Sequence, residues 1–378
     1  MSDVEIEEIL DHKEEFCVSI ILPTHRLMPD RFQDKLVFKK IVSEVKNLLI
    51  EKSKESQKDI SNVIENLEKQ YEQIDFNHSL DGLGIFVSST ISKSIRFPFS
   101  VVEKISISDK FYVRDLLYYN QTMFDYYVLS LQENEVRLFE GLGSKLNEVH
   151  NTDFPLEYII EYEYSDASRI TSNGSTVFKQ FEKDKTEIQE IRMKDFFKKA
   201  DKKLVNYEYF GRPILLAGDK RLITDYLQLT KNLNNVIGKI QGNFNVDILQ
   251  DFSVKAWGEV QRSFRTAHNN LLSTLPDLVG SEMIAVGISD VWRTAAEGKG
   301  LELIVEKDLI KPAYFSSDKY LMKLNQQAND ESYKRINDLV ETIIETVLSK
   351  NGRVVFVENG SMGNFDGIAL KLRYPDLG

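Results

Sequence analysis

The sequence predicts an α/β protein with three domains, spanning residues 1–120, 121–265 and 266–378. The chain has 378 residues, more than one ordinary domain holds, so two or three domains are expected. Short apolar runs alternate with segments whose apolar residues recur every three or four positions, a pattern typical of alternating strands and helices. A hydrophobic fraction of 42% is enough to fill buried cores.

The first domain is predicted from a buried strand and two amphipathic helices. Residues 17–23, Cys-Val-Ser-Ile-Ile-Leu-Pro, form an apolar run of strand length. The next segment places apolar residues on one helix face: Val37, Ile41, Val45 and Leu48. A second helix is expected from Asp59, acting as its N-cap, and residues 81–89 predict a turn and another strand.

The second domain is predicted to open with a β-hairpin of residues 123–131 and 136–141, joined by the turn Gln-Glu-Asn-Glu. A polar stretch follows, and then a helix with a basic face over residues 188–205. Residues 213–218 predict a strand, after which Asp219 caps a further helix.

The third domain is expected to be an α/β/α sandwich, in which Ser289 or Asp290 caps the first helix and Gly298 closes it. The chain ends with two apolar runs, residues 353–357 and 368–374, and the stretch between them contains three glycines: Gly360, Gly363 and Gly367. A phosphate-binding loop opens a helix, whereas this glycine cluster opens a strand. We therefore predict that the two runs form a hairpin.

The formal net charge of −11 argues against a protein that coats nucleic acid non-specifically, and we expect no binding to DNA. Much of the negative charge lies in residues 1–15, which carry seven acids against one lysine. Residues 179–203 instead carry nine basic and six acidic residues, a net charge of +3. The uneven distribution therefore still allows a local basic patch.

The sequence does not specify an enzyme, and we expect no cofactor, no metal site and no catalytic residue. The single cysteine, Cys17, excludes an internal disulfide, and its position within an apolar run indicates a buried structural thiol. His25 follows a predicted strand end, but the five histidines show no helical pairing, which favours a surface or hydrogen-bonded histidine over a base. No apolar run approaches the roughly 20 residues of a membrane span. The acidic N-terminus differs from a signal peptide, so we expect a cytoplasmic protein without membrane contact.

The polar segment 165–187 is the strongest candidate for a binding site, since long polar connections inside compact domains are often functional. It combines aromatic Phe178 and Phe181 with groups that suit phosphate contact: Arg169, Asn173, Gly174, Lys179, Lys183 and Lys185. These residue types contact phosphates and stack on bases in RNA-binding proteins. The alternative is a surface loop followed by a solvated helix face.

Several stretches, in order along the chain, resemble the bacterial archaeo-eukaryotic release-factor-like proteins, family 3 in particular, which are relatives of class-1 release factors and Pelota. In the first domain these are Cys-Val-Ser-Ile-Ile-Leu-Pro and Asp-Gly-Leu-Gly-Ile-Phe-Val-Ser, and in the second the hairpin over residues 124–141. Near the end they are residues 290–308 and the final strand Gly-Ile-Ala-Leu-Lys-Leu-Arg-Tyr. The resemblance implies an RNase H-like middle domain and a C-terminal sandwich of the kink-turn-RNA-binding ribosomal-protein type.

Two departures from the release-factor pattern bear on mechanism. Release factors carry Gly-Gly-Gln on the middle-domain loop, but no Gly-Gly-Gln occurs here, and Gln180 lacks the preceding glycines. Codon-reading factors carry Asn-Ile-Lys-Ser between two helices of the first domain, where this chain keeps only Lys52 and Ser53 of that motif. Peptide release and stop-codon decoding by these routes are therefore not expected.

The resemblance implies a non-hydrolytic factor that occupies the tRNA entry site of ribosomes in rescue, quality control or hibernation. Its partner would be ribosomal RNA, with a translational GTPase as a further candidate partner. The implied contacts in the first domain are Lys52, Ser53, Lys54 and Lys58. Two alternatives stay open, namely a peptidyl-tRNA or tRNA hydrolase without Gly-Gly-Gln, and a protein-interaction scaffold.

Overall fold

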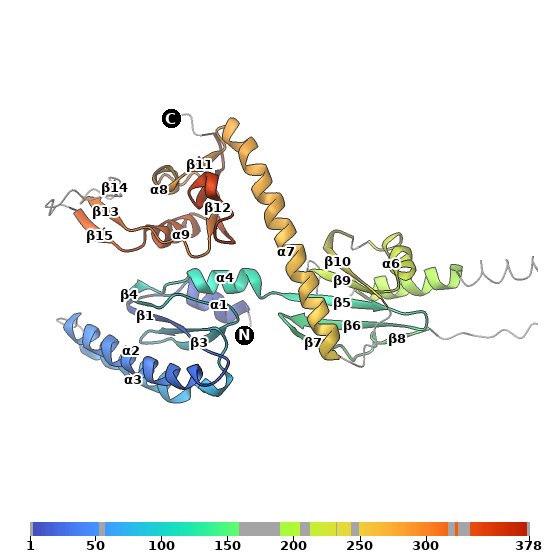
Figure 1. Cartoon of the computed structure of the whole chain (residues 1–378), viewed down its shortest axis with the longest axis horizontal. Coiled ribbons are helices and arrows are strands. Elements are labelled where there is room, and N and C mark those ends of the chain that lie inside the picture. The colour runs from blue at the N-terminus through green and yellow to red at the C-terminus, as the bar shows by residue number, and fades with distance from the viewer. Residues whose placement is uncertain are drawn as a thin grey trace, which may run out of the picture. The chain divides into compact units, whose positions relative to one another are not determined.

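A computed structural model describes residues 3–52, 57–158, 190–204, 212–231, 233–242, 249–316, 322–323 and 333–375. The chain is mixed α/β, as predicted, and divides into two compact units (Figure 1). The first unit joins Met1–Thr122 to Leu272–Gly378, and the second is Met123–Leu271. Within the first unit we call residues 1–122 the N-lobe and residues 272–378 the C-lobe. The three predicted domain boundaries stay a prediction.

The N-lobe is built on an antiparallel sheet in the order β3-β2-β1-β4. Its strands are β1 (Lys13–Pro23), β2 (Gly82–Val87), β3 (Ser92–Phe97) and β4 (Lys104–Lys110). Its helices are α1 (Asp3–Leu10), α2 (Asp30–Lys52), α3 (Gln57–Gln73) and α4 (Arg114–Thr122). The strand predicted over residues 17–23 is confirmed, whereas α3 begins two residues before the predicted cap, Asp59.

Strand β1 is buried on both faces because it lies inside the sheet between two layers of helices. Side chains alternate across a strand, so Val18, Ile20 and Leu22 share one face. They pack in a core with α2 and α3. Cys17 and Ile21 face the opposite core, to which α1 and α4 contribute.

The second unit contains a six-stranded sheet in the order β10-β9-β5-β6-β7, with β8 also paired to β6. Its strands are β5 (Asp125–Leu131), β6 (Glu135–Leu142), β7 (Lys145–Glu148), β8 (Leu156–Glu157), β9 (Ile214–Gly218) and β10 (Val236–Gln241). Strands β10, β9 and β5 run parallel, and β5, β6 and β7 are antiparallel, which confirms the predicted β5–β6 hairpin. The helix at 190–204 and α6 (Lys220–Leu227) cover one face, while α7 (Leu249–Gly280) covers the other. Asp219 caps α6 as predicted, since its carboxylate accepts from the Arg221 N–H at 2.8 Å.

Gly141 on β6 leaves the space that the buried Tyr126 ring fills. A Cβ atom at position 141 would lie 2.4 Å from the Tyr126 Cζ atom, far inside van der Waals contact. Tyr126 cannot move aside freely, because its hydroxyl donates to the Gly143 carbonyl at 2.9 Å. We expect Gly141→Ala to lower the free energy of unfolding of the second unit by about 1–3 kcal/mol through overpacking.

The measurement for Gly141→Ala is urea unfolding in a Trp292→Phe background. Trp257, which stacks on Tyr126 at 6.2 Å, is then the only tryptophan and reports the second unit. The matched control is Gly258→Ala on α7, where a Cβ meets nothing within 4 Å. This control should raise stability by up to about 1 kcal/mol, since alanine favours a helix over glycine. Equal effects of the two substitutions would contradict the overpacking argument.

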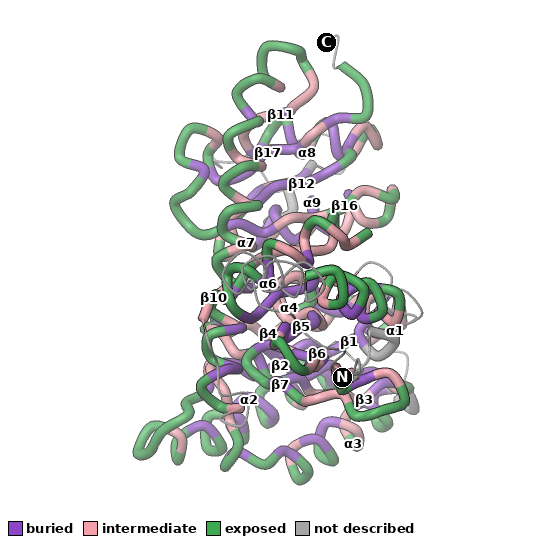
Figure 2. Tube along the Cα trace, turned by 90° about the vertical axis from the view of Figure 1, so that its right-hand side faces the viewer, coloured by how far each residue is buried: buried purple, intermediate pink, exposed green. Residues whose placement is uncertain are grey.

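The C-lobe has a four-stranded sheet in the order β11-β17-β12-β16 and a small sheet in the order β14-β13-β15. The first sheet contains β11 (Ile284–Val286), β12 (Gly300–Glu306), β16 (Arg353–Val357) and β17 (Ile368–Leu372). The second contains β13 (Ala313–Ser316), β14 (Met322–Lys323) and β15 (Tyr333–Ile336). Helices α8 (Ile288–Ala296) and α9 (Leu339–Ser349) pack with both sheets in one core. Buried residues follow the strands of this lobe in Figure 2.

The predicted terminal hairpin is wrong, although the final strand is present. Strand β12 lies between the two apolar runs, pairing parallel with β16 and antiparallel with β17. β12 is the long, mostly buried strand of this sheet, so it takes the centre and β16 becomes an edge. Gly360 and Gly367 have positive φ angles of 80° and 78°, so they serve the turns of the connection that crosses β12.

The predicted N-cap of α8 is also wrong, while its predicted end is confirmed. The helix follows Gly287, which has φ 76° and makes no side-chain capping bond, so Ser289 and Asp290 lie inside the first turn. Gly298 has φ 80° and donates its N–H to the Ala295 carbonyl at 3.0 Å, which ends the helix as expected.

Candidate nucleic-acid interface

The structure describes the residues at the ends of both predicted contact segments, but not residues 53–56 or 159–189 between those ends. Lys52 is the last residue of α2 and Lys58 the second residue of α3, and these helices pack together. Ser53 and Lys54, like the side chains of Lys52 and Lys58, lie outside the described residues. The same holds for the middle-domain candidates, which all fall within residues 159–189: Arg169, Asn173, Gly174, Lys179, Lys183 and Lys185. Both segments stay predictions.

The segment 159–189 starts from the β5–β6 end of the sheet in the second unit. β8 pairs with the beginning of β6, and the Tyr158 N–H donates to the Asn134 carbonyl at 2.7 Å. The Tyr158 ring lies 5.2 Å from the ring of Phe196, which belongs to the helix at 190–204. Tyr158, just before the segment, and the helix at 190–204, just after it, therefore contact each other and pack on the same sheet.

The helix at 190–204 is held by an apolar stripe and by one buried carboxylate. Its buried residues recur at helical spacing: Phe196, Phe197, Ala200, Asp201 and Leu204. Asp201 accepts from the Tyr226 hydroxyl at 2.9 Å, the Thr230 hydroxyl at 2.6 Å and the Lys231 N–H at 3.2 Å. Burial, and next the adjacent Asp201 carboxylate, raise the pKa of Tyr226, so this hydroxyl stays a donor.

The opposite side of this helix is basic. The helix carries six basic residues and three acidic ones, and one of the acids, Asp201, is buried. Lys198 pairs with Asp195 at 3.0 Å and Lys203 with Asp153 at 2.8 Å. The remaining basic residues are exposed and pair with no acid among the residues that the structure describes: Arg192, Lys194, Lys199 and Lys202. Such a face suits a polyanion.

Sequence reasoning identified the basic character of this helix but missed its anchor. The available signal was an acid at i+4 from Phe197, inside the apolar stripe, where a carboxylate needs donors from another element. Asp201 finds those donors on α6, at Tyr226, and just after α6, at Thr230 and Lys231, which are separated from it by 25 to 30 positions.

A pocket of about 520 Å³ opens at the carboxyl ends of β5, β9 and β10. Open parallel sheets place ligands at this edge. Its wall includes Gly218, where a Cβ would lie 2.4 Å from the Leu131 carbonyl oxygen, so only glycine fits there. Arg221 contributes a cation, Asp219 and Glu133 contribute acids, and Asn134 connects the pocket to the start of segment 159–189. The wall is polar and of mixed charge.

His25 and Cys17 have the structural roles that the sequence favoured. The exposed His25 ring shares a hydrogen bond of 2.8 Å with Asp34, and this bond raises the pKa of His25. The Cys17 thiol is buried and donates weakly to the Glu14 and Asp109 carbonyls at 3.7 and 3.6 Å. Burial raises the pKa of Cys17 to about 11, so the thiol is protonated and unreactive at neutral pH.

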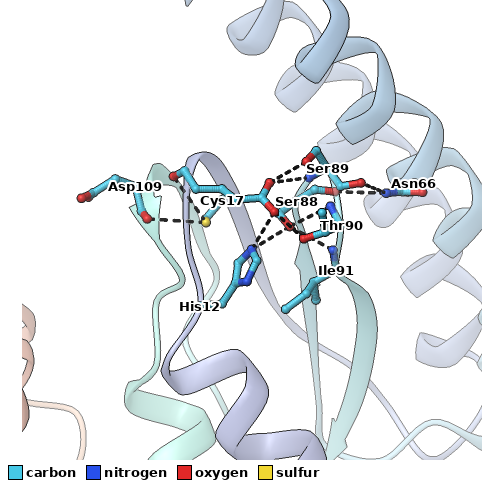
Figure 3. A network of polar contacts seen from close by, with 9 residues as sticks. His12, Cys17, Asn66, Ser88, Ser89, Thr90, Ile91 and Asp109 are labelled. Atoms are coloured by element: carbon cyan, nitrogen blue, oxygen red, sulfur yellow. Dashed lines mark hydrogen bonds and ion pairs between the residues drawn. The ribbon is translucent and has the colours of Figure 1, made fainter.

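A second polar network, not foreseen from the sequence, closes the end of the N-lobe sheet (Figure 3). The Glu14 carboxylate accepts from the Ser89 N–H at 3.0 Å, from the Ser89 hydroxyl at 2.7 Å and from the Thr90 hydroxyl. His12 lies 3.1 Å from Glu14 and 2.9 Å from the Ser88 hydroxyl. These hydrogen bonds lower the pKa of Glu14 despite its burial, and they bind the start of β1 to the β2–β3 turn.

The described parts of the chain contain neither a metal-binding cluster nor a membrane-spanning helix. Over those ranges, no group of three or more His, Cys, Asp or Glu side chains is placed to hold a metal ion. Over the same residues, no helix has the length and apolar character to cross a membrane.

Comparison with protein families gives a match over residues 125–299, to the family described as bacterial archaeo-eukaryotic release factor family 3. The matched range contains the whole sheet of the second unit, the pocket and the basic helix. No curated protein matches the chain in sequence.

Solved structures similar to the chain include Dom34, Pelota and aRF1. S. cerevisiae Dom34, a translation termination-like factor, is 11% identical with a TM-score of 0.42, over 79% of this chain and 74% of Dom34. Archaeoglobus fulgidus Pelota is 15% identical with a TM-score of 0.33, over 79% of this chain and 86% of Pelota. An archaeal translation termination factor, aRF1, is 13% identical with a TM-score of 0.25, over 99% of both chains.

Proposed function

Because residues 125–299 of this chain belong to the bacterial archaeo-eukaryotic release factor family 3, we propose that it binds the tRNA entry site of ribosomes without hydrolysing peptidyl-tRNA. It acts in rescue, quality control or hibernation of ribosomes. The family match carries the proposal, and the exposed cations of the helix at 190–204 support it, since ribosomal RNA is a polyanion.

In this proposal the second unit is an RNase H-like domain whose segment 159–189 approaches the peptidyl-transferase centre. The helix that follows the segment contacts RNA phosphates through Arg192, Lys194, Lys199 and Lys202. Without Gly-Gly-Gln, the segment offers no glutamine on a flexible glycine pair to position water at the ester, so binding does not lead to release.

The N-lobe faces the decoding centre through the connection between α2 and α3, where Lys52, Ser53, Lys54 and Lys58 contact ribosomal RNA. The C-lobe, a sandwich of the kink-turn-RNA-binding type, is the surface for a translational GTPase. Two RNA contacts on one chain give avidity, and this reconciles ribosome binding with a net charge of −11.

The test measures ribosome binding by sucrose-gradient co-sedimentation at several salt concentrations. We expect wild-type protein to co-migrate with bacterial ribosomes and to lose affinity between about 50 and about 200 mM salt. Lys199→Ala combined with Lys202→Ala should weaken binding and lower the slope of log affinity against log salt by about 2. The matched control is Lys145→Ala, an exposed lysine on the edge strand β7 and outside the basic helix, which should leave the slope unchanged.

Two outcomes would contradict the proposal in different ways. Wild-type protein that never co-migrates with ribosomes, in extracts of growing or of starved cells, excludes ribosome binding and leaves the scaffold alternative. Peptidyl-tRNA hydrolysis by the purified protein, lost in Arg169→Ala, would keep ribosome binding but replace the non-hydrolytic role by the hydrolase alternative.

A further inference from the structure

Helix α4 contributes to the cores of both lobes of the first unit. Leu116 is fully buried in the N-lobe core, whereas Tyr118 packs against the C-lobe core. Near the end of the helix, the Gln121 side-chain amide donates to the Phe356 carbonyl and accepts from the Phe356 N–H, both at 2.8 Å. These bonds occupy the backbone of β16, an edge strand that would otherwise offer unpaired groups to another chain.

Arg114, the first residue of α4, is the centre of the polar contacts between the lobes. Its guanidinium donates to the Leu309 carbonyl at 2.8 Å and to the Asp338 carboxylate at 2.9 Å. Lys104 of β4 donates to the same Asp338 oxygen at 3.1 Å. The other Asp338 oxygen accepts from the Val340 N–H at 3.1 Å and caps α9, so Asp338 ties the start of α9 to the N-lobe.

Glu341, in the first turn of α9, is buried with one oxygen poorly satisfied. One carboxylate oxygen accepts from the Val113 N–H at 3.0 Å, and the other lies 3.5 Å from Arg114 Nε. Within the described residues, neither that second oxygen nor Arg114 Nε has a hydrogen-bond partner. A buried carboxylate oxygen without a donor favours the neutral acid, because desolvating a charge costs far more than desolvating a hydroxyl.

Lys307 of the C-lobe makes a second contact on the same surface. Its ammonium donates to the Ser100 carbonyl at 2.6 Å and lies 4.5 Å from the Phe99 ring centroid and 4.9 Å from that of Tyr118. Burial lowers the pKa of Lys307, and the nearby Asp308 and Asp115 oppose this effect. The ammonium is thus largely removed from water between the two lobes.

The charged side chains at this surface come from both lobes. They are three cations and three carboxylates: Lys104, Arg114, Lys307, Asp115, Asp338 and Glu341. Tyr112 also faces Arg114 and Glu341. Burial raises the pKa of Glu341 to about 7, although Arg114 and Lys104 oppose this, and burial raises the pKa of Asp115 to about 6.

We propose that α4 and these six charged side chains form a proton-sensitive joint, which holds the N-lobe against the C-lobe when protonated and opens when it loses a proton. In the open joint, water hydrates Glu341 and Asp115, and their protons pass to the solvent. In the closed joint, a deprotonated Glu341 would keep a charged oxygen buried without a hydrogen-bond donor among the described residues, with Arg114 Nε at 3.5 Å as its ion-pair partner.

The direction of the pH effect follows from the two states of Glu341. Its pKa is about 7 in the closed joint and returns toward the ordinary 4.5 when the residue is hydrated. Between these values the closed joint holds a proton that the open joint has lost, so the closed joint is favoured at low pH. Rising pH therefore increases the ratio of open to closed molecules by up to about tenfold per pH unit, with no further effect of Glu341 above its closed-state pKa.

The experiment measures the distance between spin labels on the two lobes of the full chain by pulsed electron resonance. Gln73→Cys on α3 and Ser289→Cys on α8 are both exposed positions for the labels. Cys17 needs no replacement because its buried, protonated thiol does not react. From about pH 5.5 to about pH 8, the wild-type distance distribution should gain a second population at the expense of the first.

Glu341→Gln removes one titrating proton while keeping the size of the side chain, so above the Asp115 pKa of about 6 its distance distribution should no longer change with pH. The matched control is Glu358→Gln, an exposed acid of the same lobe, which should respond to pH as the wild type does. A wild-type distribution that does not change with pH would overturn the proposal. Equal pH responses of Glu341→Gln and wild type would overturn it as well, whichever way the other variants behave.

Discussion

Replacing Arg114 with methionine is expected to lower the free energy of unfolding of the first unit by about 3–5 kcal/mol. Arg114 is only 3% exposed, and its guanidinium contacts Leu309, Asp338 and Glu341. Methionine has a similar length, so the packing loss is small, but two buried carboxylates lose their main cation. Removal of one partner from a buried ionic cluster costs more than the cluster contributes as a whole, because it leaves charge uncompensated.

The measurement is urea unfolding in a Trp257→Phe background, where Trp292 on α8 reports the first unit. Adding Glu341→Gln to Arg114→Met should recover part of the loss, because at neutral pH, near the Glu341 pKa of about 7, part of that carboxylate is charged, whereas the amide is always neutral. The matched control is Arg96→Met, an exposed arginine that donates to the Asp75 carbonyl at 3.0 Å, with an expected change below about 1 kcal/mol. A comparable loss in the free energy of unfolding for Arg114→Met and Arg96→Met would show that the buried ionic cluster does not make Arg114 more important for stability than an exposed arginine.

The second large effect is expected for Asp201→Ala, which should lower the free energy of unfolding of the second unit by about 2–4 kcal/mol. The substitution removes the acceptor of three donors, the Tyr226 hydroxyl, the Thr230 hydroxyl and the Lys231 N–H. Tyr226 is 1% exposed, so water cannot replace the lost carboxylate there without opening the core. The same change loosens the helix that carries the exposed cations.

Trp257 fluorescence during urea unfolding, in the Trp292→Phe background, measures this loss, and co-sedimentation measures the effect on ribosome binding. The matched control is Asp195→Ala on the same helix, an exposed acid that pairs with Lys198 at 3.0 Å. Its expected cost is below about 0.5 kcal/mol, and it should tighten ribosome binding slightly by adding net positive charge. If Asp201→Ala and Asp195→Ala proved equally mild, Asp201 would not be the anchor of the helix.

Local patterns predicted the elements well where one stretch of chain contains the whole signal. The apolar run over residues 17–23 is a buried strand, the β5–β6 hairpin pairs as expected, and Asp219 caps α6. The start of α8 was missed because Gly287, which lacks a capping side chain, takes the position before the helix. Glycine can adopt the required backbone angles without a capping bond, so no sequence signal marked the boundary.

Pairings between distant elements could not be predicted in the same way. The last two apolar runs appear as a hairpin from their spacing, but β12, about 50 residues upstream of β16 and more than 60 upstream of β17, lies between them. Strand order depends on which strand buries both faces, and periodicity within one strand does not reveal its neighbours.

The sequence by itself determined the mixed α/β class, the excess of negative charge, the basic character of residues 179–203 and the lack of Gly-Gly-Gln. Each of these depends on composition or on neighbouring residues. Only the tertiary structure decided that Asp201 holds the basic helix and that Arg114 meets Asp338, which is 224 residues away. The reason is that a side chain loses its water only after elements distant in the sequence have packed around it. No local pattern in the sequence distinguishes such a buried charged residue from an exposed one, although its burial gives it a large effect on stability.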